Sequence, residues 1–437
     1  MTSMTLLSCL RRAANTNATL QWRFIHTLQR RQQLHQQCRR MHAATTAATA
    51  TTTRDSCNET KFNANGSEQR RAMSSSSSSS APKLVAVAES RRFMIDCFLA
   101  VKVPQAHAEA QADLLVAADH RGHFSHGMNR LEMYINDLAI NSTDGGAEPV
   151  VLKETPSTAW VDGRNGLGAV VGNYCMDLAI KKAKQVGVGW VCAKGSNHYG
   201  MAGWYSIRAM DQGLVGISMT NTSPLMAPTR SKEAALGTNP LAVGAPATNG
   251  DKFLLDMATT AVAVGKIEIQ RRKGAPLPDG WAQDPSGNVT NDAELGFSTG
   301  CLMPLGGSEL TSGYKGYGLG AMVDILTGVM SGAHYSTQVR KWTHAGANSA
   351  ADLGQVFIAV DPNCFAPNFE ERMSDFNSRL RSSAPTDSSK PVLLAGDKES
   401  QNMQAVNAVG GIQYLENQLK TCAALAEKLK IKPLGFL

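Results

Sequence analysis

The sequence lacks the features that define several protein classes. Its nine cysteines are an odd number and include no CxxC pair, which argues against a disulfide framework or a zinc ribbon and fits a reducing compartment. The body of the chain has no run of the ~18 uninterrupted apolar residues that a membrane-spanning helix needs, so membrane insertion is not expected. No Walker loop or nucleophile elbow occurs, which removes support for phosphoryl transfer and serine hydrolysis.

Acidic residues are absent from the first 54 positions, and this absence marks the amino-terminal segment. The stretch contains eight Arg and no Lys before Asp55, with apolar residues scattered among Ser, Thr, Ala and Gln. This composition is typical of a mitochondrial transit peptide. Residues 1–82 are therefore predicted to be a disordered leader that directs the protein to mitochondria. The alternatives are a leader without an address and a cytoplasmic chain that starts at Met73.

The net charge of the remaining chain is close to zero. Residues 1–82 carry 11 Lys and Arg against 3 Asp and Glu, a net of +8, so the total of +7 leaves −1 for residues 83–437. A nucleic-acid-binding domain would show a basic face in its folded part. Nucleic acid is therefore not expected as a partner.

Strand and helix patterns alternate between residues 158 and 220, which indicates an α/β layer architecture. Residues 275–300 are expected to form a long surface excursion, and 315–332 a buried helix. The tail from 402 to 430 reads as an amphipathic helix. Helices are predicted at 85–103, 104–120, 128–140, 169–187, 202–213 and 261–274, and strands at 158–163, 188–195, 214–220, 239–247, 252–260 and 355–362.

The segment RGHFSHGMNR at 121–130 offers the groups that hold a carboxylate beside a carbonyl. Ser125 supplies a hydroxyl, His126 an imidazole and Arg130 a guanidinium fork. A helix start at this point would add unpaired N–H groups and a partial positive charge. The alternative is that Ser125 only caps the helix and Arg130 is a solvated surface residue.

A second segment, KGSNHYGMAG at 194–203, places His198 just past a predicted strand and just before a helix. Open α/β sheets bind ligands at such positions. An imidazole can give or take a proton near neutral pH, so His198 is a candidate general acid/base. A structural or surface histidine is the alternative.

Two further patterns have competing interpretations. His120, His123 and His126 recur at three-residue intervals and suggest a metal-dependent hydrolase, but Gly122 breaks the helical spacing and no partner completes a tetrahedron. No metal site is therefore expected. The glycines at 166, 168 and 172 have the spacing G-x-G-x-x-x-G, which departs from the dinucleotide fingerprint and favours a tight turn.

Seven motifs then follow one another in the order and spacing of a known family: RGHFSHGMNRLEMY, KGSNHYGMAGWYS, MTNTSP, LGTNPLAVGAP, LDMATTAVAVGKI, GWAQDPSGN and SGYKGYGLGAMVDIL. The chain resembles the malate/L-lactate dehydrogenase family, which includes L-sulfolactate, ureidoglycolate and 2,3-diketogulonate enzymes. The resemblance implies an L-sulfolactate dehydrogenase-like layered α/β fold with a mixed sheet and helical N- and C-terminal segments, not a Rossmann fold. It also implies hydride transfer between NAD or NADP and a small 2-hydroxy or 2-oxo acid.

The resemblance assigns roles to individual residues. His198 matches the general acid/base, and Ser125, His126 and Arg130 match the groups that hold the substrate. The tail reads LLAGDKE at 393–399, with alanine where the family commonly has proline. The positions that match cofactor-binding residues are Thr222, Asp256, Met257, Ala258, Lys315, Gly316 and Gly396.

These roles divide the chain into a leader (1–82) and a catalytic unit (83–437). Within the catalytic unit we expect a helical substrate-clamp segment (83–150), an α/β cofactor-binding core (151–380), and a linker with a C-terminal helix (381–437). Malate is the expected substrate, since a basic clamp suits a dicarboxylate. The alternatives are L-lactate, sulfopyruvate, ureidoglycolate, diketogulonate or a cyclic imino acid, or a catalytically silent metabolite-binding protein. The resemblance also implies a homodimer.

Overall fold

The computed structural model describes residues 83–341 and 349–437. A seven-stranded sheet forms its centre, and five of the six pairs of neighbouring strands are antiparallel, with β3–β4 the parallel pair. A Rossmann sheet is mostly parallel, so the predicted mixed, non-Rossmann α/β fold is confirmed. Across the sheet the strands are β2 (Val150–Glu154), β3 (Thr158–Asp162), β4 (Val188–Ser196), β10 (Leu353–Val360), β5 (Val215–Thr220), β6 (Leu241–Pro246) and β7 (Lys252–Met257).

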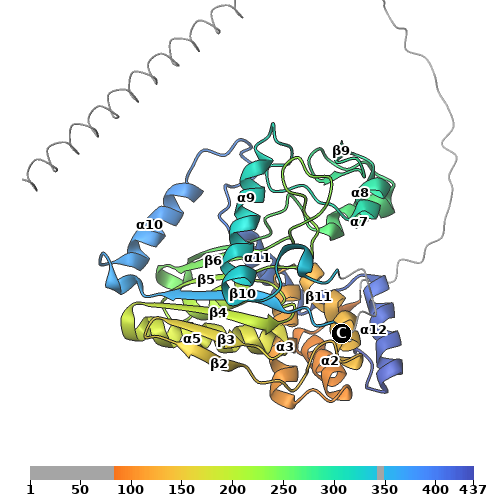
Figure 1. Ribbon diagram of the computed structural model, residues 1–437, viewed down its shortest axis with the longest axis horizontal. Coiled ribbons are helices and arrows are strands. Elements are labelled where there is room, and N and C mark those ends of the chain that lie inside the picture. The colour runs from red at the N-terminus through yellow and green to blue at the C-terminus, as the bar shows by residue number, and fades with distance from the viewer. Residues whose placement is uncertain (1–82, 342–348) are drawn as a thin grey trace, which may run out of the picture. The chain divides into compact units, whose positions relative to one another are not determined.

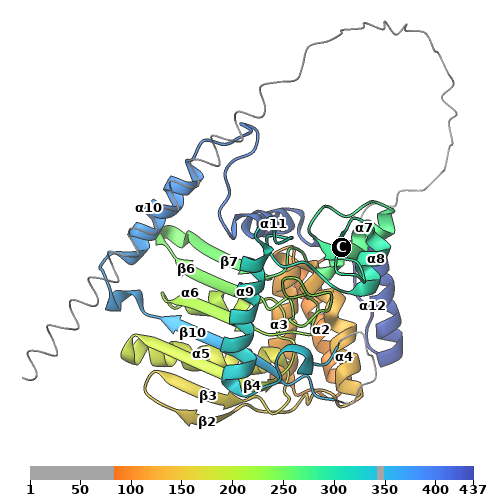
Figure 2. The same ribbon diagram turned by 45° about the horizontal axis from the view of Figure 1, so that its top comes forward.

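Successive side chains of the central strand β10 point to opposite sides of the sheet. Helices cover both of these sides. Phe357 packs with helices α5 (Gly168–Val186) and α6 (Gly203–Met210). Val356 and Ile358 contact Val323 on α9 (Gly313–Asp324) on the other side. Figures 1 and 2 show α9 across one face of the sheet and α5 on the opposite side.

Helices from residues 83–341 and from residues 349–437 gather at one end of the sheet (Figures 1 and 2). Strand β1 (Leu84–Val85) pairs with β11 (Ile412–Gln413), and the surrounding helices share one apolar core. The chain therefore returns at its C-terminal end to the helices with which the described chain begins. These helices are α2 (Val87–Ala100), α3 (Gln105–His120), α4 (Leu131–Ala139), α11 (Asp397–Val409) and α12 (Glu416–Leu429).

Two predictions about single segments need correction, and a third gains detail. The tail forms two helices rather than one, because Gly410 ends α11 with a φ of 83° and Ile412 then pairs with Val85. The segment 275–300, which was predicted as a long surface excursion, has secondary structure of its own. It contains β8 (Ala282–Gln283), β9 (Val289–Thr290) and α8 (Ala293–Thr299), which pack with α7 (Val264–Lys273) around a small apolar core. Asp292 caps α8 by accepting the N–H groups of Glu294 and Leu295.

The predicted buried helix at 315–332 has an exposed side. Helix α9 passes at Asp324 into a π-helical turn, Ile325–Val329, and the Ile325 side chain is 55% exposed. Helix α10 (Phe369–Arg381) has no counterpart among the sequence predictions. Among the described residues no helix is both long and apolar enough to cross a membrane.

Candidate active site

Three strands deliver the candidate residues to one edge of the sheet. Strands β4, β5 and β7 run in the same direction, because each is separated from the next by one antiparallel strand. Their carboxyl ends therefore lie at the same edge. His198 follows β4 by two residues, Thr222 follows β5 by two, and Asp256 and Met257 end β7 with Ala258 next. Topology alone brings five of the eleven predicted residues to a common side.

The substrate-clamp segment leaves α3 through Gly122, whose φ is 84°. Two 3-10 turns follow, Phe124–His126 and Met128–Arg130, and lead into α4. Ser125 Oγ lies 2.9 Å from Nδ1 of His126, and Nε of Arg130 donates to the Ser125 carbonyl at 2.8 Å. Ser125 makes no capping bond to α4, and Arg130 is half-buried. The interpretation of a cap and a solvated arginine is therefore wrong.

The clamp meets His198 directly. The imidazole rings of His126 and His198 are stacked, with centroids 5.8 Å apart and 17° between their planes. Burial, reinforced by the charge of Arg130, lowers the pKa of His126 to about 4. Burial lowers the pKa of Arg130 as well, and the described residues provide it with no ion pair. The clamp therefore presents one cation without an ion pair, which the carboxylate of Glu268 stabilises only from a distance, beside two neutral imidazoles.

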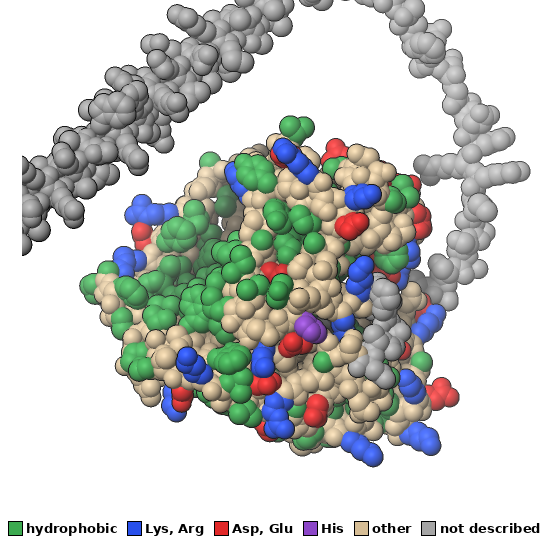
Figure 3. All heavy atoms as spheres, viewed as in Figure 1, with side chains coloured by type: hydrophobic (Ala, Val, Ile, Leu, Met, Phe, Trp, Pro, Cys, Tyr) green, Lys and Arg blue, Asp and Glu red, His purple; other side chains and the backbone are tan. Residues whose placement is uncertain are grey.

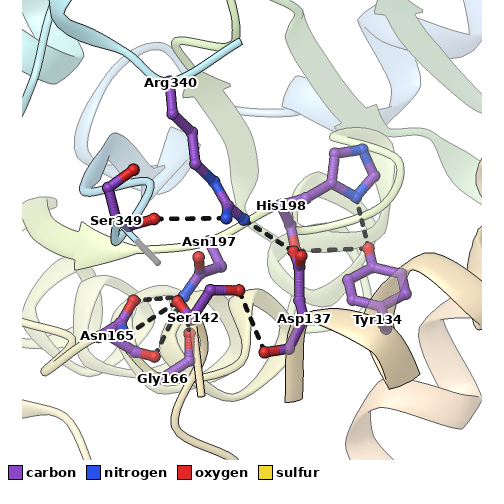
Figure 4. A network of polar contacts seen from close by, with 9 residues as sticks. All are labelled: Tyr134, Asp137, Ser142, Asn165, Gly166, Asn197, His198, Arg340 and Ser349. Atoms are coloured by element: carbon purple, nitrogen blue, oxygen red, sulfur yellow. Dashed lines mark hydrogen bonds and ion pairs between the residues drawn. The ribbon is translucent and has the colours of Figure 1, made fainter. Parts of the chain in front are cut away.

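Tyr134 holds His198 from the other side (Figure 4). Its hydroxyl bonds to Nδ1 of His198, and the Gly200 N–H donates to the same nitrogen at 3.3 Å. The pKa of His198 lies well below its ordinary value, first because of burial and then because of the nearby His126 and Arg130. Since a backbone N–H can only donate, Nδ1 is an acceptor and the proton of the neutral ring is on Nε2.

The loop that bears His198 is fixed by amide and glycine contacts. Asn197 Nδ2 donates to the carbonyls of Asn165 at 3.1 Å and Gly166 at 2.9 Å (Figure 4). A β-carbon on Gly168 would lie 2.2 Å from the His198 carbonyl oxygen. The glycine run that departs from the dinucleotide fingerprint thus allows the His198 loop to approach α5 closely.

An ion pair anchors the far end of α4. Arg340 donates to Asp137 at 2.7 Å and to the Ser349 carbonyl at 3.3 Å, and Figure 4 shows this pair together with His198 and Tyr134. Tyr134 and Asp137 lie three residues apart on one side of α4, and Arg130 immediately precedes the helix, four positions before Tyr134. The start and one face of α4 thus carry the clamp arginine, the His198 partner and the anchor.

A cavity of about 430 Å³ lies next to this edge and contains two of the predicted cofactor residues, Asp256 and Gly396. The Gly203 N–H donates to Oδ2 of Asp256 at 2.7 Å, and burial raises the pKa of this carboxyl. Arg121 also lines the cavity, and its pKa is lowered by burial. A half-buried acceptor and a half-buried cation in one cavity suit a ligand that carries hydroxyl and phosphate groups.

The other predicted cofactor residues lie outside the lining of this cavity. Thr222 Oγ1 accepts the Thr238 N–H at 2.9 Å. Gly316 packs so closely on Leu305 that a β-carbon would lie 2.2 Å from the Leu305 carbonyl oxygen. Lys315 is exposed in the first turn of α9. Met257 and Ala258 directly follow Asp256.

The three spaced histidines do not converge on a metal. His120 Nε2 lies 2.9 Å from Asn407 Oδ1, whereas His123 Nε2 lies 3.6 Å from Glu399 Oε1. His126 belongs to the clamp. Within residues 83–341 and 349–437 no group of three metal-ligating side chains is present. The metal-dependent hydrolase is therefore without support in this part of the chain.

Sequence reasoning missed four residues of the site. Tyr134 follows Arg130 by one helical turn, and that spacing was a usable signal. Arg121, His123 and Glu399 line the cavity. They become neighbours only because α11 returns to the end of α3, and no local pattern shows this contact.

Comparisons with known proteins agree with this architecture. A family model described as malate/L-lactate dehydrogenase matches residues 85–422. The malate dehydrogenase of Pyrococcus horikoshii is 41% identical over 345 residues, covering 78% of this chain and 94% of the relative. Its solved structure superposes with a TM-score of 0.74 at 36% identity, over 80% of this chain and 97% of that one.

Two other relatives have different named substrates. The L-sulfolactate dehydrogenase of Methanocaldococcus jannaschii is 38% identical over 333 residues, covering 76% of this chain and 93% of the relative. The NAD(+)-dependent ureidoglycolate dehydrogenase of Escherichia coli K12 is 34% identical over 317 residues, covering 71% and 86%.

Proposed function

The chain belongs to the malate/L-lactate dehydrogenase family, and within that family we propose malate and oxaloacetate as its substrate pair. The reaction class is that of an NAD(P)-dependent 2-hydroxyacid dehydrogenase. The observation that carries the proposal is the half-buried guanidinium of Arg130, which forms no ion pair among the described residues. A site whose cation has no ion pair favours a substrate with two carboxylates over one with a single carboxylate. The similarity to malate dehydrogenases supports the same choice.

Substrate binding and proton transfer are coupled in this site. In our proposal, Arg130 and Ser125 hold the carboxylate next to the reacting carbon, and His126 lies beside the carbonyl. The carboxylate neutralises Arg130 and so removes one of the charges that lower the pKa of His198. His198 then becomes able to hold a proton and to donate it from Nε2 to the oxygen that becomes the hydroxyl. In malate oxidation the proton of the neutral ring first passes from Nε2 to Nδ1, where the Tyr134 hydroxyl accepts its hydrogen bond, and Nε2 is then free to take the substrate proton.

Tyr134 can support both protonation states of His198. Toward the neutral ring with its proton on Nε2 the hydroxyl donates to Nδ1, and toward the charged ring, or the neutral ring with its proton on Nδ1, it accepts from Nδ1. In the second case its own proton can turn to the His198 carbonyl oxygen, which lies 3.4 Å away. Burial raises the pKa of Tyr134 above its ordinary value, so the phenol keeps its proton in either state.

NAD or NADP supplies or accepts the hydride at the substrate carbon when bound. The cavity with Asp256, Gly396 and Arg121 fits its hydroxyl- and phosphate-bearing part. We assign Thr222, Met257, Ala258, Lys315 and Gly316 to the remaining contacts. Met257 ends β7, and Thr222 and Ala258 follow strand ends on the same side as His198.

The test is oxidation of NADH and NADPH by the full chain, followed at the nicotinamide absorbance. The panel contains oxaloacetate, pyruvate, sulfopyruvate, glyoxylate, 2,3-diketogulonate and a cyclic imino acid. The highest kcat/KM with oxaloacetate supports the proposal. A higher kcat/KM with another acid contradicts malate and oxaloacetate as the substrate pair and identifies that acid as the substrate. A folded protein that turns over none of them favours the silent metabolite-binding protein.

We further propose a homodimer. Apolar side chains gather on the face where α9, α10 and β10 lie in Figure 1, as Figure 3 shows. On the turn after α9 the exposed fractions are 55% for Ile325, 49% for Val329 and 51% for Met330, which is unusual for side chains of this kind. Light scattering should give twice the chain mass, and Ile325→Glu with Met330→Glu should give the monomer. Val289→Glu, on the short strand β9, is the control.

For localisation we propose mitochondria, on the composition of residues 1–82, which lie outside the described residues. A fluorescent fusion of the full chain should colocalise with a mitochondrial dye, and a fusion that starts at Met73 should not. Diffuse fluorescence from both would remove the proposal.

A further inference from the structure

A carboxyl group lies directly behind the substrate clamp and takes no part in the mechanism above. Asp119 is in the last turn of α3, and its side chain is completely buried. Its Oδ2 accepts the N–H of Met128 at 2.8 Å. Met128 stands between His126 and Arg130, so this bond holds the centre of the clamp segment.

Gly127, the residue before Met128, packs closely against the same carboxyl. A β-carbon on Gly127 would lie 1.9 Å from Oδ1 of Asp119, so no side chain fits there while Asp119 keeps its position. The backbone between His126 and Met128 therefore rests on the Asp119 carboxyl. Any movement of that carboxyl changes the relation of Ser125 and His126 to Arg130.

The rest of the network reaches the C-terminal segment. The Tyr414 hydroxyl lies 2.9 Å from Oδ2 of Asp119 and 3.2 Å from the Ser90 hydroxyl on α2. Oδ1 is buried and has no hydrogen-bond partner among the described residues. A charged carboxylate with one unpaired, buried oxygen is costly, and a proton reduces that cost.

The surroundings of Asp119 favour its neutral form. Burial raises its pKa to about 7 although the hydrogen bonds from Met128 and Tyr414 lower it, and no cation in the described chain adds to their effect. Two titratable groups face it, Tyr414 from the segment after β11 and the Cys422 thiol of α12. The groups from α2 and from the clamp turns are the uncharged Ser90 hydroxyl and the Met128 N–H. None of these supplies a positive charge.

We propose that Asp119 is a positioning residue of the substrate clamp, and that the clamp holds an anionic substrate in full only while Asp119 carries its proton. Loss of the proton leaves a buried charge with an unpaired oxygen pressed against Gly127. The structure then relaxes by admitting water or shifting the clamp turn, and Arg130 loses its place relative to Ser125. Only the measurement of KM depends on the proposed function; the rest of this inference does not.

The expected size of the effect follows from the fraction of protein that is competent to bind. With a pKa of about 7, the protonated fraction falls from ~0.9 at pH 6 to ~0.1 at pH 8, so the apparent KM rises up to about tenfold. Ionisation of Asp119 should change KM, whereas proton transfer by His198 determines kcat. The two can be separated in one set of profiles.

The experiment compares KM and kcat of the full chain between pH 6 and 9 for the wild type, Asp119→Asn and Asp113→Asn. The asparagine at 119 keeps an acceptor for Met128 but cannot ionise. Asp113 is on the same helix and pairs with Arg91 at the surface, so its variant is the charge-matched control. We expect KM to rise with pH in the wild type and the control, and to stay flat in Asp119→Asn. Parallel KM profiles in all three proteins overturn the proposal.

A second readout needs no substrate. Hydrogen–deuterium exchange of the peptide that contains Met128, corrected for the intrinsic effect of pH, should show protection that falls above pH 7 in the wild type and not in Asp119→Asn. Tyr414→Phe, which loses one bond to Oδ2, should shift the loss of protection to higher pH, and it replaces Asp119→Asn if that variant does not fold. Protection independent of pH in the wild type overturns the proposal. An absence of turnover with intact exchange behaviour contradicts the proposed function alone.

Discussion

The rings of His126 and His198 lie stacked at a centroid distance of 5.8 Å, although 72 positions separate them in the chain. Each ring has its Nδ1 engaged by a hydroxyl, Ser125 for His126 and Tyr134 for His198. Both pKa values lie below the ordinary value because the rings are buried near Arg130. The site thus contains two neutral imidazoles, and an incoming anion changes their charge balance.

Replacing His198 removes the group that exchanges a proton with the substrate oxygen. We expect His198→Ala to lower kcat by ~10²–10⁴-fold, the usual contribution of a general acid/base. KM should change little, since Arg130 and Ser125 remain. Steady-state kinetics with oxaloacetate measures both constants. A variant that keeps kcat within a factor of three of the wild type would exclude the assigned role.

Tyr134→Phe removes one hydrogen bond to Nδ1 of His198 and leaves the ring in place. One such bond contributes ~1 kcal/mol, so kcat should fall about fivefold. Because Tyr134 has no contact with the substrate in our proposal, KM should stay near the wild-type value. Tyr174→Phe on α5, whose ring is 39% exposed, is the control. A rise in KM without a change in kcat would show that Tyr134 binds substrate instead.

The sequence predicted the elements whose patterns are local. Strands β4, β5 and β7 and helix α5 follow from period-two and helical patterns, and their order places His198, Thr222 and Asp256 at one edge. The clamp residues Ser125, His126 and Arg130 were found from a single segment of ten residues. These predictions needed no knowledge of distant contacts.

The remaining features depend on contacts between distant segments. The break at Gly410 is stabilised by pairing of Ile412 with Val85, and Asp119 reaches Tyr414 across 295 positions. The cavity beside Asp256 exists because Gly396 and Glu399 return to α3. The exposed side of α9 could not be predicted from its apolar composition, since composition does not state what covers a helix.

Arg130→Met removes the positive charge of the clamp. We expect KM for oxaloacetate to rise at least tenfold, because a charged hydrogen bond contributes ~1.5–3 kcal/mol. A smaller fall in kcat should follow from lost orientation. Arg379→Met, an exposed residue of α10 that pairs with Asp375, should leave both constants unchanged. A fall in kcat alone, with KM constant, would contradict a role in substrate binding.

The lowered pKa of His198 predicts the pH dependence of malate oxidation. This direction needs the neutral ring, and in the free enzyme the ring stays neutral to well below pH 6.5. The kcat/KM for malate should therefore show no loss attributable to His198 until the pH is well below 6.5. Profiles of kcat/KM at saturating cofactor test this. An acidic limb at or above pH 6.5 would show that His198 is charged more easily than the buried geometry implies.

Gly168→Ala tests whether the glycine run supports the His198 loop. The new β-carbon would lie 2.2 Å from the His198 carbonyl oxygen and 2.6 Å from that of Asn197, so the loop must move. Because misplacement of a reacting group by about 1 Å can cost ~10²-fold, we expect a fall in kcat of that order in a protein that still folds. Gly318→Ala on α9 is the matched control, since nothing lies within 4 Å of its added carbon and alanine favours the helix. Circular dichroism and thermal denaturation separate the outcomes: lost activity with retained secondary structure in Gly168→Ala supports the loop's role. Full activity in a folded Gly168→Ala protein would mean that the His198 loop tolerates displacement and that its contact with α5 does not position the ring.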